Sequence, residues 1–157
     1  MFAALSASYA QSDKNTIPVV DILTMEGEST STSSFNNQGK PMVISMWATW
    51  CKPCILELNE LQDVYEDWQE ETGVKIMAIS SDDARSMKRV PAFVSGKGWD
   101  FEVYLDPNAD FKRAMNVNNL PHVFLLDGEG KVVWQHSGYS IGNEELLYDE
   151  ILKLTGE

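Results

Sequence analysis

Residues 47–54 read WATWCKPC, a stretch that contains both cysteines of the 157-residue chain, Cys51 and Cys54. A CxxC pair can form half of a metal site, a structural crosslink or a redox-active dithiol. The pair follows Met42–Trp47 (MVISMW), an apolar run with the length and composition of a buried strand, and it opens a segment with helical periodicity. Which of the three uses applies therefore decides how the rest of the chain is interpreted.

A metal site is the least favoured of the three uses. Tetrahedral zinc needs four ligands. Beyond the two cysteines, the soft ligands are His122 and His136, at spacings unlike those of a zinc finger. Haem attachment requires a histidine directly after the second cysteine, where this chain has Ile55. We therefore expect no metal, and no cofactor other than a redox-active disulfide between the cysteines themselves.

The position of the pair favours a redox role over a structural one. Closing so short a loop removes little entropy from the unfolded chain, about 2 kcal/mol at most. Cys51 is expected near a helix N-terminus, where free N–H groups and the helix dipole favour a thiolate. Pro53 fits the first helical turn because its missing N–H has no partner there. Cys54 lies one turn deeper, so we predict that Cys51 is the exposed nucleophile and Cys54 the buried resolving thiol.

Glu57 occupies an unexpected place on the predicted helix. An apolar stripe runs along one face, and acidic side chains gather on the opposite face, as solvation requires. Glu57 falls inside the apolar stripe, one turn after Cys54. It is either solvated at the boundary or partly buried near the sulfurs, where a raised pKa suits a proton donor and acceptor. Its position favours the second alternative. The stripe consists of Cys54, Leu58, Leu61, Tyr65 and Trp68.

Apolar patterns divide the rest of the chain into alternating elements. Pro91 interrupts one helical segment and indicates a kink or a new helix start. The order of elements predicts a single domain of the α/β or α+β class. Strands are expected at 17–23 and 29–35, which form a hairpin, and at 42–47, 74–80, 101–105, 123–126 and 131–136. Helices are expected at 55–72, 84–97, 107–115 and 143–154.

Charge and the N-terminal residues limit the location and the partners. The formal net charge of -12 argues against nucleic-acid or anionic-membrane surfaces, because both need a positive patch. Residues 1–10 (MFAALSASYA) are uncharged, and Ser8 and Ala10 are small residues at the spacing that a signal peptidase prefers. We interpret 1–10 as the remnant of a signal peptide. No later segment approaches the roughly 18 apolar residues of a membrane span.

These motifs together resemble the thioredoxin-like exported reductases of the TlpA/ResA group, which are related to the cytochrome c maturation thioredoxins. The resemblance runs from about residue 17 to the C-terminus. Its most specific element is WATWCxPC, with Glu57 three residues beyond the second cysteine. The other matching stretches, in order, are Gly39–Pro41 (GKP), Leu105–Pro107 (LDP), Leu120–Pro121, Phe124–Asp127 (FLLD) and Gly130–Val133 (GKVV).

The resemblance implies an α/β thioredoxin-like fold over residues 11–157, with a central mixed sheet flanked by helices, an N-terminal β-hairpin and a central insert. It implies that Cys51 is the nucleophile, Cys54 the resolving thiol and Glu57 an acidic modulator. It also implies a cis peptide at Pro121, packed against the CxxC, with Leu120 offering backbone groups to a substrate strand. The remaining residues expected to support the site are Trp50, Lys52, Pro53 and His122.

Three residues depart from the pattern of the group or of thioredoxin. Asn59 stands where the group usually has a proline two residues after the glutamate, so a helix kink there, and the placement of Glu57, are open. His122 replaces a threonine and is either a polar neighbour of the site or a titratable group that stabilises the Cys51 thiolate. Ser45 occupies the position of the buried aspartate of thioredoxin, which would leave Glu57 as the acid near the thiols.

The function favoured by these features is an exported, periplasm-facing thiol-disulfide oxidoreductase that reduces disulfides in other exported proteins. Its expected partners are disulfide-containing clients, possible substrates of cytochrome c maturation among them, and a membrane thiol that donates electrons; we expect a monomer. A peroxiredoxin-like peroxidase is a rival, but it needs a Pro-x-x-x-Thr-x-x-Cys frame, and Ala48 stands at the threonine position. A non-catalytic binding module is a second rival, which the intact CxxC argues against.

Overall fold

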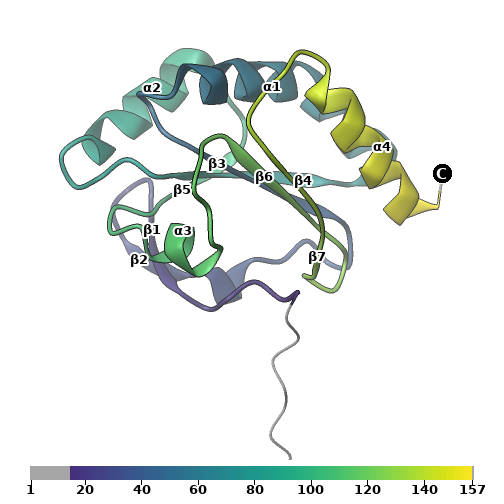
Figure 1. The fold of residues 1–157 in the computed structure, drawn as a ribbon, viewed down its shortest axis with the longest axis horizontal. Helices are drawn as coiled ribbons and strands as arrows, with labels where there is room; N and C mark the ends of the chain where they lie inside the picture. The colour runs from purple at the N-terminus through teal and green to yellow at the C-terminus, as the bar shows by residue number, and fades with distance from the viewer. Residues whose placement is uncertain (1–14, 157) are drawn as a thin grey trace, which may run out of the picture.

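A mixed sheet in the order β2-β1-β5-β4-β3-β6-β7 forms the centre of the computed structural model, which describes residues 15–156 (Figure 1). The strands are β1 (Asp21–Thr24), β2 (Ser29–Ser31), β3 (Met42–Trp47), β4 (Lys75–Ser80), β5 (Glu102–Leu105), β6 (His122–Leu126) and β7 (Val132–Ser137). The helices are α1 (Lys52–Thr72), α2 (Val90–Lys97), α3 (Asp110–Ala114) and α4 (Asn143–Thr155), with 3-10 turns at Thr32–Ser34 and Met87–Arg89.

Strand pairing brings the CxxC loop next to the start of β6. Strands β3, β4 and β5 are parallel, whereas β6 runs antiparallel to β3 and β7 antiparallel to β6. Met46, near the carboxyl end of β3, pairs with His122, the first residue of β6. The segment that precedes His122 therefore lies beside the loop that carries the cysteines.

Helices cover both faces of the sheet and create two cores. Helices α1, α2 and α4 lie on one face, and α3 lies on the other (Figure 1). Because β3 is buried on both faces, its residues alternate between the cores. Val43 and Trp47 pack with Cys54 under α1. Ile44 and Met46 pack with Phe111 of α3.

Helix α1 begins and ends where the sequence indicates. Cys51 is its N-cap residue, and Pro53 lies in the first turn. Gly73 ends the helix in the left-handed conformation, with φ of 72°, and its N–H donates to the carbonyl of Gln69. A residue with a Cβ is disfavoured in that conformation, which explains the glycine.

The N-terminal hairpin is present but shorter than predicted. β1 and β2 pair antiparallel from Asp21 to Leu23. In the segment before β1, the backbone groups bind the side chain of Thr32 instead of a neighbouring strand. The Thr32 hydroxyl donates to the carbonyl of Pro18 at 2.8 Å and accepts from the N–H of Val20 at 3.0 Å. The predicted strands 17–23 and 29–35 are therefore each too long, because a polar side chain satisfies the backbone groups that a ladder would use.

The other predicted elements agree with the structure to within three residues, except that the helix expected at 84–97 begins at Val90, after a 3-10 turn. Pro91 is at the start of α2 rather than in a kink, so the alternative of a new helix is the correct one. Between residues 15 and 156, no helix combines the length and apolar character that crossing a bilayer requires. The predicted signal-peptide remnant at 1–10 lies outside the described residues.

Candidate active site

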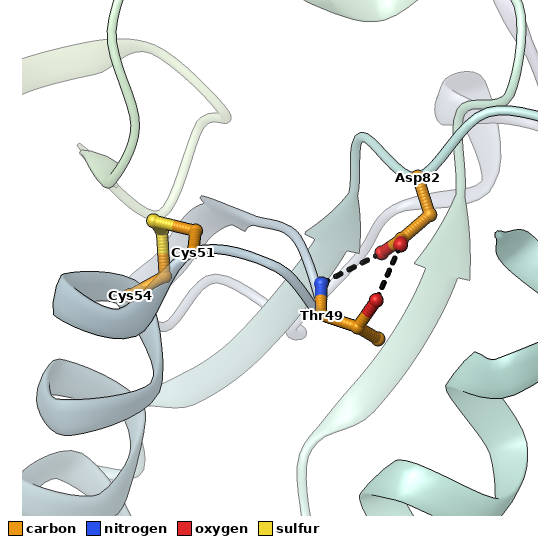
Figure 2. Close-up of a disulfide and its surroundings, with 4 residues drawn as sticks. All are labelled: Thr49, Cys51, Cys54 and Asp82. Carbon is orange, nitrogen blue, oxygen red and sulfur yellow. Dashed lines mark hydrogen bonds between the residues drawn. A yellow bond between two sulfur atoms is a disulfide. The ribbon is translucent and has the colours of Figure 1, made fainter.

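The two cysteines form a disulfide at the N-terminus of α1, with their Cα atoms 5.3 Å apart (Figure 2). The Cys51 residue is 7% exposed and Cys54 is fully buried. Cys51 is the N-cap, so the free N–H groups of the first turn lie next to its sulfur. The accessible sulfur is thus the one that the helix terminus favours as a thiolate, and the second sulfur lies behind it.

Exposed side chains surround the accessible cysteine. Trp50, directly before it, is 65% exposed, and Leu56 on the next turn is 55% exposed. Lys52 and Pro53 are also exposed. Together these side chains present an apolar surface with a single positive charge to an approaching chain. The roles of Trp50, Lys52 and Pro53 in binding remain predictions, and Leu56 was not among the residues predicted.

Asp82 anchors the loop between β3 and the cysteines. Figure 2 shows its carboxylate directed at Thr49: one oxygen accepts from the Thr49 N–H at 2.9 Å, the other from the Thr49 hydroxyl at 2.6 Å. The Ser80 hydroxyl also donates to this carboxylate, at 2.6 Å. Burial alone would raise the pKa of Asp82, but the hydrogen bonds from Ser80 and Thr49 outweigh it and hold the pKa below its ordinary value.

Asp82 is a residue of the site that was not predicted from the sequence. A signal for it exists, because Asp82 lies two residues after the end of β4, which pairs in parallel with β3. The carboxyl ends of neighbouring parallel strands meet at one edge of a sheet, and polar residues there face the same crevice. Both Asp82 and the CxxC loop lie at that edge.

The Leu120–Pro121 peptide bond is cis, as the resemblance implied. The Pro121 carbonyl accepts a hydrogen bond from the Gly138 N–H at 2.8 Å, which ties this turn to the end of β7. Leu120 is partly buried and packs against both cores. The turn is thereby fixed beside the end of β3, where the expected contact of Leu120 with substrate remains a prediction.

Glu57 is buried on the inner face of α1, as its position in the apolar stripe indicated. It is 4% exposed, and its Oε1 atom has no hydrogen-bond partner among the described residues. Burial, with a smaller contribution from the negative charge of Glu144, raises the pKa of Glu57 from 4.5 to about 8. A carboxyl group that exchanges its proton near neutral pH, one turn from Cys54, can accept and return the proton of a thiol.

Asn59 does not displace Glu57. Helix α1 continues through it from Lys52 to Thr72. The Asn59 side-chain carbonyl accepts a hydrogen bond from Nε1 of Trp99 at 2.9 Å, so this residue joins α1 to the segment after α2. Ser45 is buried on the face of β3 that packs against α1. The expectation that Glu57 is the sole acid near the thiols is incomplete, since Glu144 acts on it electrostatically.

The structure does not place His122 beside Glu57. Its ring stacks on Phe124, with ring centroids 4.4 Å apart, and its Nε2 lies 2.9 Å from Oε1 of Gln135. Phe124 belongs to the core on the α3 side of the sheet, opposite α1. These contacts fit the polar-neighbour alternative, whereas a role in stabilising the Cys51 thiolate stays a prediction without a contact to support it.

Comparisons with known proteins agree with this geometry. The model of the AhpC/TSA family matches residues 14–135. The thiol-disulfide oxidoreductase ResA of Bacillus thuringiensis subsp. konkukian is 30% identical over 131 residues, which are 83% of this chain and 72% of the relative. An uncharacterized thioredoxin-like protein from Porphyromonas gingivalis, solved in solution, is 46% identical with a TM-score of 0.81, over 91% of this chain and 94% of that one.

A crystal structure from Chlorobium tepidum, described as a thiol:disulfide interchange protein DsbE, has a TM-score of 0.78 at 25% identity and covers 90% of this chain and 96% of that one. The high coverage on both sides means that the whole sheet and its helices are shared, not a local motif. The expected thioredoxin-like fold and the resemblance to the TlpA/ResA group are thereby confirmed.

Proposed function

The chain belongs to the AhpC/TSA family and is a TlpA/ResA-like thiol-disulfide oxidoreductase, and from this premise we propose that it reduces disulfides in exported proteins. The observation that carries the proposal is the asymmetry of the pair: Cys51, at the helix N-terminus, keeps 7% of its surface exposed, while Cys54 is fully buried one turn from a buried acid. This is the arrangement that a two-step exchange requires, with one sulfur to attack and one to resolve.

In the first step, the Cys51 thiolate attacks a client disulfide and forms a mixed disulfide, and the displaced client sulfur leaves as a thiolate. In the second step, Cys54 loses its proton to the ionised form of Glu57 and attacks Cys51. The Cys51–Cys54 bond forms, the bond from Cys51 to the client breaks, and the second client sulfur leaves with the electron pair. The client gains two electrons and takes up two protons, and the enzyme is left oxidised.

The direction of transfer follows from the proposed location. Extracytoplasmic compartments are oxidising, so a protein that reduces disulfides there must itself be re-reduced. We assign this task to a membrane-bound dithiol donor. The clients are disulfide-bearing exported chains, and the CxxC of an apocytochrome c is one substrate with suitable chemistry.

The reduction potential of the Cys51–Cys54 couple tests the direction. A value near that of thioredoxin, about -270 mV, supports a reductase, and a value near that of DsbA, about -120 mV, would identify an oxidant and contradict the proposal. Turnover with a disulfide substrate and with hydrogen peroxide separates the rival chemistry. Catalytic peroxide reduction without disulfide turnover would support the peroxidase instead.

A further inference from the structure

Two carboxylates from different helices line one small cavity between α1, α4 and the sheet. Glu57 reaches it from α1, and Glu144 reaches it from the first turn of α4. The volume open to the centre of a water molecule is about 10 Å³, which is room for about one water. Apart from the two acids, the walls are His136, Asn143 and the apolar side chains of Leu61, Val123, Trp134 and Leu147.

Each acid directs a buried oxygen without a hydrogen-bond partner into this region. Among the described residues, neither Oε1 of Glu57 nor Oε2 of Glu144 has a partner, and both atoms are inaccessible to bulk solvent. A buried polar atom without a partner is unfavourable, and a single water needs two or more polar groups to be held. The two unpartnered carboxylate oxygens are the groups that a water between the helices would bind.

The charges around the cavity do not allow both acids to ionise freely. Tyr139, on the loop between β7 and α4, adds a further acidic group near Glu57, Glu60 and Glu144. His136 is the titratable group that β7 contributes, and no lysine or arginine of the described chain lines the cavity. The negative charge of Glu144 disfavours the ionised form of Glu57.

The two carboxyl groups have different surroundings. Glu144 is partly exposed and lies in the first turn of α4, where the free N–H groups favour a negative charge. Glu57 is enclosed in the core, where a neutral carboxyl is favoured. The proton therefore rests on Glu57, and the partner that can pass it to solvent is Glu144.

We propose that Glu57 and Glu144 hold one proton between them across a bridging water, and that Glu144 carries this proton between Glu57 and the solvent. Glu57 first passes its proton through the water to Glu144 and on to the solvent, and its carboxylate then accepts the Cys54 proton as Cys54 attacks Cys51. Reduction by the donor returns a proton along the same route. Glu144 thus acts through Glu57 and does not touch the reacting sulfurs. The catalytic part of this inference rests on the proposed function, whereas the pairing of the two acids does not.

The pairing is tested in the oxidised protein, in which no thiol titrates. Side-chain carboxyl ¹³C shifts report the titration of Glu57 directly. In the parent protein, the Glu57 curve should extend over two steps, because the proton belongs to the pair. In Glu144→Gln, it should become a single step with its midpoint lower by about one pH unit, since the like charge is gone.

Glu145→Gln is the matched control, because Glu145 lies in the same first turn of α4 but is exposed. It should leave the Glu57 curve unchanged. An unchanged curve in Glu144→Gln, or the same shift in Glu145→Gln, would overturn the pairing. If Glu144→Gln loses its folded spectrum, Glu144→Asp withdraws the carboxylate while keeping its charge, and an unaltered Glu57 curve there would equally overturn it.

The relay itself is tested with the reduced protein. The rate of Cys54 alkylation against pH, measured in a Cys51→Ser background, should shift in Glu144→Gln and stay unchanged in Glu145→Gln. Coupled carboxyl titrations without an effect on Cys54 would overturn the relay. Coupled titrations in a protein that turns over no disulfide would instead contradict the proposed function and leave the pairing intact.

Discussion

At the scale of single residues, the two sulfurs differ in what surrounds them, although they are joined to each other. Cys51 borders solvent and the helix terminus, and Cys54 lies among Val43, Trp47 and Leu58 in the core under α1. Their chemical roles follow from this difference, because only an accessible thiolate can reach a client.

Single cysteine variants should therefore behave in opposite ways. Cys54→Ser leaves the attacking thiolate but removes the resolving one, so mixed disulfides with client proteins should accumulate. Cys51→Ser should trap none. Non-reducing electrophoresis of both variants after reaction with a disulfide-containing client checks this. Adducts with Cys51→Ser alone would reverse the assignment of the two sulfurs.

The residue scale also shows what a sequence can and cannot indicate about this site. Glu57 was recognisable because helical periodicity places it on an apolar face one turn from Cys54, which is a local relation. Glu144 was not, because its contact with Glu57 depends on how α4 docks against α1. Asp82 lay between these cases: its position after a strand was visible, but its hydrogen bonds to Thr49 require the register of two parallel strands.

At the scale of elements, the loop that carries the CxxC depends on a neighbouring strand end. In Asp82→Ala, the Thr49 N–H, the Thr49 hydroxyl and the Ser80 hydroxyl would each lose an acceptor. Hydrogen bonds to a charged group of this kind contribute about 1.5–3 kcal/mol. We therefore expect the free energy of unfolding, measured in urea, to fall by about 2–3 kcal/mol.

Asp83→Ala provides the comparison, because Asp83 is exposed and binds only local groups, the N–H groups of Arg85 and Ser86. Its loss should lower stability by clearly less than the loss of Asp82. Equal losses in the free energy of unfolding would show that the hydrogen bonds to Thr49 stabilise the protein no more than local turn bonds do.

Two turns that are far apart in sequence pack against each other at the ends of β3 and β6 that lie opposite the site. A Cβ added at Gly128, in the turn between β6 and β7, would overlap the carbonyl group of Gly39, in the turn before β3. Gly128→Ala should therefore destabilise the protein by about 1–3 kcal/mol, since backbone has to move. Thermal unfolding checks this.

Gly96→Ala is the matched substitution, because a Cβ at Gly96 in α2 meets no atom within 4 Å. It should be neutral or stabilising by about 0.5 kcal/mol, through helix propensity. A Gly128→Ala variant as stable as Gly96→Ala would mean that the two turns separate without cost.

The elements also explain why the predicted fold was correct and some of its boundaries were not. Long apolar segments such as β3 and the stripe of α1 have one way to bury their surface. The N-terminal hairpin contains few apolar residues and many hydroxyls, so its boundaries depend on which groups Thr32 and Ser31 bind. Those hydrogen bonds depend on tertiary packing, so the periodicity of the sequence does not predict them.

At the scale of the whole molecule, one buried acid makes folding sensitive to pH. Because burial raises the pKa of Glu57 from 4.5 to about 8, the folded protein binds a proton that the unfolded chain has already lost between those pH values. Its contribution to stability is fully present below about pH 4.5 and is lost as the pH rises through about 8. A shift of this size corresponds to roughly 4–5 kcal/mol.

Glu57→Gln keeps the shape of the side chain and removes this titration. Urea unfolding of the oxidised protein at pH 5 and pH 9 should show similar stabilities for variant and parent at pH 5. At pH 9, the variant should be more stable by several kcal/mol. Glu60→Gln, at an exposed position on the same helix, should follow the parent at both pH values. A constant difference between Glu57→Gln and the parent would show that Glu57 does not titrate in this range.

The exposed indole of Trp50, which directly precedes Cys51, should make the fluorescence of the protein depend on its redox state. An excited indole passes an electron to a nearby disulfide far more readily than to a pair of thiols, so the disulfide quenches its fluorescence. Trp47 lies in the core, in edge contact with Trp99 and in the same cluster as Cys54. We therefore expect the indole emission to rise on reduction, so that turnover can be followed without a label.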